Sequence, residues 1–199
     1  MSFIERMILA CSLVVVTGDA GAVVLDFESL EHVDALATPH GFEYAEDGFV
    51  LETFDFFGFA SFGTESPFFS GSTALFNDTP GGLTILSHAA GLPFSLSAID
   101  LTELDTDMGA SVTFVGFTAL GMAVFETFTL DGNAFQPETF SFSPGFSNLT
   151  AVSWTQGAPF HQFDNIVVEA VPEPASLALV GLGLVALGLY RRKRSPTGA

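Results

Sequence analysis

The sequence predicts an all-β protein, a two-sheet β-sandwich of jelly-roll type, flanked by an N-terminal signal peptide and a short C-terminal transmembrane helix. Three observations support the sandwich. Apolar and polar residues alternate in short runs, Phe, Val and Thr dominate these runs, and Gly, Pro, Asn and Asp separate them at short intervals. No window has the pattern of an amphipathic helix. Nine or ten short strands in roughly 150 residues favour two packed sheets.

The predicted strands are the segments where this alternation or β-rich composition is clearest. They cover residues 23–27, 48–54, 83–87, 94–101, 110–117, 123–130, 139–143, 149–155 and 163–169. No linker rich in Pro and Ser follows the last of them. The chain is therefore divided into a signal peptide (1–22), a β-sandwich domain (23–170) and a C-terminal tail (171–194).

The first 22 residues have the order of a secretory signal peptide. Arg6 precedes an apolar run over 7–16, and small residues then lead to Ala20-Gly21-Ala22. This A-x-A pattern predicts cleavage by signal peptidase after Ala22. Cys11, the only cysteine, lies in the segment to be removed. The mature domain is therefore expected to lack both thiols and disulfides, so its core must hold it together.

Charge is distributed very unevenly along the chain. There are 23 acidic and 5 basic residues, a net charge of −18, and the basic residues are Arg6 and the four at 191–194. The domain between them has no Lys or Arg. Because phosphate backbones and anionic lipids are bound through cationic side chains, nucleic-acid binding is excluded for this domain. Soluble cations, neutral glycans and basic partners are compatible with it.

The tail combines a helix-breaking motif, an apolar stretch and a basic end. Pro172, Glu173 and Pro174 cannot lie inside a helix, although Pro174 can begin one. The uncharged stretch 175–190 would form a helix of about 24 Å, slightly shorter than the ~30 Å hydrocarbon core of a bilayer. Four residues then form a positive stop-transfer end: Arg191, Arg192, Lys193 and Arg194. Such an end stays cytoplasmic, which places the acidic domain outside.

This ordered tail resembles the PEP-CTERM sorting tail of Gram-negative bacteria. The resemblance implies export across the inner membrane, a transient membrane anchor, and processing by an exosortase near residues 172–174. It also implies a final location in the envelope, on the surface or outside the cell, in association with exopolysaccharide or biofilm. Only the tail carries this resemblance, so it does not define the activity of the domain.

The domain itself resembles galactose-binding-type jelly rolls in three short segments. They are Leu25-Asp26-Phe27-Glu28, the hairpin over 107–117, and the closing stretch over 163–168. The resemblance implies a structural calcium ion held by Glu28 and Asp164, with Asp26 as a further ligand. Calcium prefers six to eight oxygen ligands, and it would neutralise acids that have no basic partner. Alternatively, Asp26 and Asp164 cap strand ends and face water.

No catalytic motif stands out. The four histidines form no metal-binding spacing, and no G-x-S-x-G motif is present, so each histidine is expected in a turn or on the surface. Trp154 and the phenylalanines are expected mainly in the core, with exposed members able to stack on sugars. The sequence thus favours a non-enzymatic secreted surface protein that contacts neutral glycan or exopolysaccharide. A secreted hydrolase of polysaccharide or ester is the alternative, and it requires a cleft where two carboxylates, or Ser, His and Asp, converge.

Overall fold

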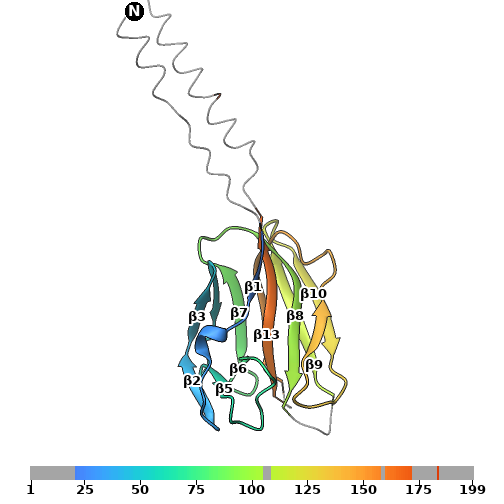
Figure 1. Ribbon diagram of the computed structural model, residues 1–199. Helices are drawn as coiled ribbons and strands as arrows, with labels where there is room; N and C mark the ends of the chain where they lie inside the picture. Colours follow the sequence, from blue (N-terminus) through green and yellow to red (C-terminus); the bar gives the residue numbers. More distant parts are fainter. Residues whose placement is uncertain (1–20, 105–108, 158–159, 172–182, 184–199) are drawn as a thin grey trace, which may run out of the picture.

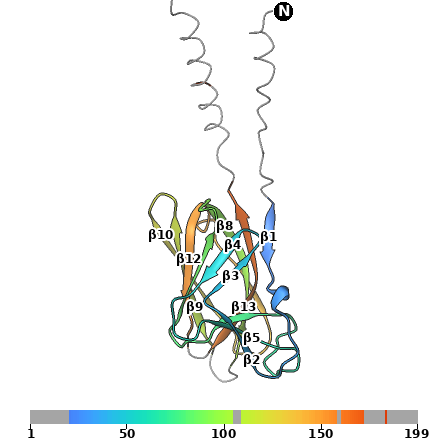
Figure 2. The ribbon, with the colours of Figure 1, turned by 90° about the vertical axis from the view of Figure 1, so that its left-hand side faces the viewer.

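The computed structural model describes residues 21–104, 109–157, 160–171 and 183. Its thirteen strands confirm the prediction of an all-β protein. Figures 1 and 2 show the strands arranged around a common interior. The first and last strands, β1 and β13, lie side by side and pair in antiparallel orientation. Among the described residues, no helix has the length and apolar character needed to cross a membrane.

Strand pairing arranges the strands in two layers. The first layer contains β1 (Ala22–Leu25), β2 (Ala37–Gly41), β5 (Phe59–Phe62), β6 (Leu75–Asn77), β8 (Phe94–Glu103), β11 (Glu138–Ser141) and β13 (His161–Ala170). The second contains β3 (Glu43–Glu46), β4 (Phe49–Glu52), β7 (Leu83–His88), β9 (Ser111–Thr118), β10 (Ala123–Thr129) and β12 (Leu149–Thr155). A single pair, Leu149 with Phe94, connects β12 to β8 and joins the layers into one sheet. The sandwich is therefore nearly closed, although five strands pair on one side only: β1, β2, β3, β10 and β11.

The core lies between the two layers and is rich in aromatic rings. Phe49 on β4 meets Phe94 on β8 with ring centroids 5.4 Å apart, and Trp154 on β12 meets Phe163 on β13 at 5.1 Å. All four side chains are buried. Burial of one such side chain contributes about 1.5 to 3 kcal/mol, so these contacts explain how the domain holds together without a disulfide.

Each of the nine predicted strands corresponds to an observed one, and 149–155 matches β12 at both ends. The structure adds four strands that the sequence pattern did not reveal: β2, β3, β5 and β6. These are short, and β2 contains both a proline and a glycine, which weaken any strand prediction. One short 3₁₀ turn, η1 (Glu28–Leu30), follows β1.

Candidate functional site

The candidate site is a surface cavity of about 480 Å³ beside β3, β4 and the turn that follows β4. It is lined by three phenylalanines, three acids and a threonine: Phe42, Phe54, Phe56, Glu43, Glu52, Asp55 and Thr53. The three rings, which we call the Phe platform, expose 53, 80 and 82 % of their surface. Rings so exposed contribute little to the core, and a group of them beside polar side chains is typical of a binding surface.

Asp55 fixes the turn that carries two rings of the platform. Its Oδ2 accepts hydrogen bonds from the Thr53 hydroxyl (2.8 Å), the Asn77 side-chain amide (3.2 Å) and the Leu83 backbone N–H (2.5 Å). Asn77 is fully buried and belongs to β6, so the turn is connected to the sandwich. A site held in this way loses little conformational entropy when a ligand binds.

The third ring, Phe42, is held close to the same turn. The Thr53 N–H donates to the Phe42 carbonyl over 2.9 Å. On the other side of the turn, Gly58 has φ +78°, and a Cβ there would lie 3.2 Å from Cδ1 of Phe42 and 2.8 Å from the carbonyl carbon of Gly41. Residue 58 must therefore be glycine for the turn to approach Phe42 this closely.

Two carboxylates face each other beside the platform. Glu43 on β3 pairs directly with Glu52 on β4, and both line the cavity. Side chains at such paired positions have Cβ atoms about 4.5 to 5.5 Å apart. The sequence has no Lys or Arg between residues 23 and 190 to neutralise them. The cavity therefore combines aromatic faces with hydrogen-bond acceptors, which suits an uncharged ligand rich in hydroxyl groups and repels anions.

The structure brings together two of the three acids predicted to bind calcium. Thr73 donates from its N–H and its hydroxyl to the Glu28 carboxylate, each over 3.2 Å, and the neighbouring Ser72 donates its hydroxyl to Asp164. Asp26 instead accepts the N–H of Glu28 over 3.1 Å, and so stabilises its own turn. Glu28 and Asp164 offer fewer oxygens than the six to eight that calcium prefers, and among the described residues no group of three or more His, Cys, Asp or Glu could hold a metal ion.

Asp164 is buried, so the alternative that it caps a strand end and faces water is wrong. Only 3 % of its surface is exposed. The pKa of Asp164 is raised to about 7, chiefly by burial and to a smaller extent by the charges of Glu28 and Asp100, against the opposing hydrogen bonds from Ser72 and the Asn165 N–H. The buried acid therefore binds a proton far more readily than an ordinary aspartate.

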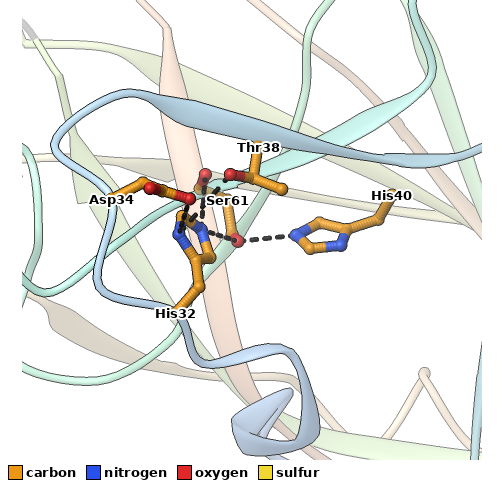
Figure 3. Close-up of polar contacts among 5 residues, drawn as sticks. All are labelled: His32, Asp34, Thr38, His40 and Ser61. Atoms are coloured by element: carbon orange, nitrogen blue, oxygen red, sulfur yellow. Dashed lines mark hydrogen bonds and ion pairs between the residues drawn. The ribbon is translucent and has the colours of Figure 1, made fainter.

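A serine, two histidines and an aspartate converge where β2 meets β5 (Figure 3). His40 Nε2 lies 2.7 Å and His32 Nε2 3.2 Å from the Ser61 hydroxyl, and Asp34 Oδ2 lies 3.5 Å from His32 Nδ1. Asp34 contacts one nitrogen of His32 and Ser61 contacts the other, which is the spatial arrangement of a serine-hydrolase triad. However, Ser61 has no exposed surface and its hydroxyl already contacts both imidazoles, so no substrate carbonyl can reach it.

The expectation that every histidine lies in a turn or on the surface is wrong for His161, whereas His32, His40 and His88 are partly exposed. His40 belongs to β2, His88 to β7 and His161 to β13. His161 is fully buried, and neither of its ring nitrogens has a hydrogen-bond partner. Burial lowers the pKa of His161 to about 4. Trp154, by contrast, lies in the core as expected, with 2 % of its surface exposed.

The Phe platform was not predicted from the sequence. One signal was available: Phe54-Asp55-Phe56-Phe57-Gly58-Phe59 contains four phenylalanines in six residues without the alternation of a strand. Several residues singled out in the terminal segments lie outside the described residues, namely Ala20, Pro172, Glu173, Pro174, Arg191, Arg192, Lys193 and Arg194. Ala22, at the predicted cleavage site, is the first residue of β1.

Comparison with known proteins supports the assignment of the tail. Residues 170–194 match the family described as the PEP-CTERM protein-sorting motif. This motif implies processing by an exosortase, and it indicates export and sorting to the cell envelope or surface. No curated protein matches the chain.

Among solved structures, two family 29 carbohydrate-binding modules are similar to the domain. One, a lysine-to-alanine mutant of CBM29-2, has a TM-score of 0.42 and 12 % identity, and the match covers 76 % of this chain and 92 % of that one. The other has a TM-score of 0.40 and 12 % identity over 69 % and 90 % of the two chains.

Proposed function

We propose that the protein is an exported, non-enzymatic surface protein whose jelly-roll-like sandwich binds a neutral glycan, such as an exopolysaccharide, at the Phe platform. The observation that carries this proposal is the exposure of Phe42, Phe54 and Phe56 around one cavity that also contains carboxylates. Aromatic rings provide large apolar faces at a low cost in conformational entropy. The apolar face of a sugar ring can stack on such a face, while its hydroxyls donate to Glu43 and Glu52.

Charge favours a neutral polymer over an anionic one. The domain has no basic residue, so an acidic polysaccharide would be repelled at short range. Hydroxyl groups, in contrast, are hydrogen-bond donors, and carboxylates are strong acceptors for them. The PEP-CTERM tail is consistent with this assignment, because it indicates sorting to the envelope or surface, where such polymers occur.

Affinity electrophoresis of the full chain in gels containing soluble neutral polysaccharides, and the exopolymer of the host cell, tests the proposal. We expect wild type to be retarded in at least one gel, and a Phe54→Ala, Phe56→Ala double variant to migrate as in an empty gel. Phe125→Ala is the matched control, because this ring is 68 % exposed but lies on β10, outside the platform. Equal retardation of all three proteins, or no retardation of wild type, would refute glycan binding at this site.

Hydrolysis of a polysaccharide is a second candidate function, and the pairing of Glu43 with Glu52 in the same cavity favours it. Glycoside hydrolases use two carboxylates, one as an acid and the other as a nucleophile or base. Glu43→Gln and Glu52→Gln distinguish the two functions. Release of reducing sugar by wild type and its loss in both variants would establish an enzyme, whereas binding without any sugar release would establish a binding protein.

A further inference from the structure

We propose that His32 and His40 form a binding site for a divalent transition-metal ion of the Zn²⁺, Cu²⁺ or Ni²⁺ class. The two imidazoles come from different parts of the fold, since His32 lies in the loop before β2 and His40 within β2. Their Nε2 atoms lie 3.2 and 2.7 Å from the same Ser61 hydroxyl oxygen (Figure 3). Each therefore points at one small region with Ser61 at its centre.

The surrounding structure fixes both rings in this arrangement. Ser61 on β5 pairs with Thr38 on β2, and the register shifts between Pro39 and Gly41, next to His40. The loop that carries His32 approaches β5 very closely at Gly63. A Cβ on residue 63 would lie 2.6 Å from His32 Nδ1, so only glycine leaves room for the ring. The position of His32 is thus built into the fold, and a preformed pair loses little entropy on metal binding.

Groups behind His32 favour the tautomer of the neutral ring that a metal requires. Asp34 Oδ2 lies 3.5 Å and the Thr38 hydroxyl 3.4 Å from Nδ1 of His32. A carboxylate at one ring nitrogen favours a proton there and leaves the lone pair on the other nitrogen, as in many metal-binding histidines. For His32, that other nitrogen is Nε2, which points toward Ser61.

The donor atoms select the class of metal. Two imidazole nitrogens suit Zn²⁺, Cu²⁺ and Ni²⁺, whereas Ca²⁺ and Mg²⁺ prefer oxygen ligands. Ser61 Oγ lies beside both nitrogens and can supply an oxygen, and water can complete the coordination from the side of the two rings, which are partly exposed although Ser61 is not. The acidic domain, without Lys or Arg, attracts cations in general, so the imidazoles provide the selectivity. This site is separate from the Phe platform and does not depend on glycan binding.

Thermal unfolding of the full chain, purified without a histidine tag, tests the site in the presence of Zn²⁺, Ni²⁺ or Ca²⁺. We expect Zn²⁺ and Ni²⁺ to raise the Tm of wild type, and this rise to be absent in His32→Gln and His40→Gln. Asp34→Asn should weaken Zn²⁺ binding by about tenfold, the lower end of the effect usual for groups that orient a metal-binding histidine. His88→Gln, which changes a histidine on β7, should keep the full response.

NMR of the wild-type protein tests the metal site even if a variant fails to fold. In NMR spectra of the imidazole protons, Zn²⁺ should shift the signals of His32 and His40 and leave those of His88 and His161 unchanged. A rise in Tm that is the same in wild type and both histidine variants would overturn the proposal. So would NMR shifts at His88, or the absence of any response to Zn²⁺ and Ni²⁺.

Discussion

Buried Asn77 donates a hydrogen bond from Nδ2 to the Asp55 carboxylate over 3.2 Å, and so connects β6 to the turn that carries Phe54 and Phe56. The same amide donates to the Thr53 hydroxyl over 2.9 Å. The exposed rings of the platform therefore depend on a residue in the interior. A substitution at Asp55 can therefore disorder the turn without removing any of the exposed rings.

Replacing Asp55 by Ala should disorder the platform without removing a ring. The variant leaves the Asn77 amide and the Leu83 N–H with one acceptor fewer, so the free energy of unfolding should fall by about 1 to 3 kcal/mol. Urea unfolding measures this loss, and retention in a glycan gel should fall with it. Asp131→Ala is the control, because Asp131 also accepts a backbone N–H, from Asn133, but in an exposed turn. Equal stability of the two variants would contradict the role assigned to Asp55.

The stability of the domain should depend on pH through Asp164. Its pKa in the folded protein is about 7, against an ordinary value of 3.8, so the folded state binds a proton that the unfolded chain releases. This group therefore lowers stability as pH rises from about 4 to 7. Asp164→Asn removes the effect, and its advantage over wild type should grow by roughly 2 to 4 kcal/mol across that range. Parallel curves of unfolding free energy against pH for the two proteins would refute this.

His161 should have the opposite effect to Asp164, and should lower the stability of the domain as pH falls. Its pKa in the folded protein is about 4, below the ordinary 6.5, so on acidification the unfolded chain gains a proton before the folded one. Stability contributed by this group is therefore lost as pH falls from about 6.5 to 4. His161→Leu should reduce the acid sensitivity and, because it removes two buried nitrogens without partners, should not destabilise the domain at pH 7. Denaturant unfolding at several pH values checks both expectations, and a variant with the acid sensitivity of wild type would contradict them.

Calcium binding by Glu28 and Asp164 stays a prediction, and it has a direct test. If calcium binds there, excess calcium should raise the Tm and a chelator should lower it, with Asp164→Asn removing the difference. Asp100→Asn is a useful control, since Asp100 lies near Asp164 but accepts hydrogen bonds from Thr139 and Asn165. A Tm that is unchanged by calcium and by chelator would exclude the ion.

The sorting motif should control where the protein is found. Replacing Pro172, Glu173 and Pro174 by Ala should prevent processing and leave a longer, membrane-associated form. Cell fractionation and gel mobility of a tagged chain, compared with the intact sequence, measure the change. If both proteins fractionate and migrate identically, the motif does not direct processing in this chain.

Features that depend only on neighbouring residues can be predicted from the sequence. Alternation within a strand is local, so β9 and β12 were predicted to within one residue at each end. The sorting tail is also a linear signal, and its residue order was sufficient to recognise it. The lack of basic residues in the domain is a property of composition, and it limits the ligands before any fold is known.

Which distant residues contact each other depends on the folded chain. Short strands such as β2 and β6 exist because they have partners, and their own sequences contain too little pattern to predict them. Asn77 reaches Asp55 across 22 positions in the chain, and His32 reaches Ser61 across 29. Such contacts are set by strand pairing and loop packing, which no local pattern encodes. For this reason the convergence of His32 and His40 on Ser61 is visible only in the folded chain.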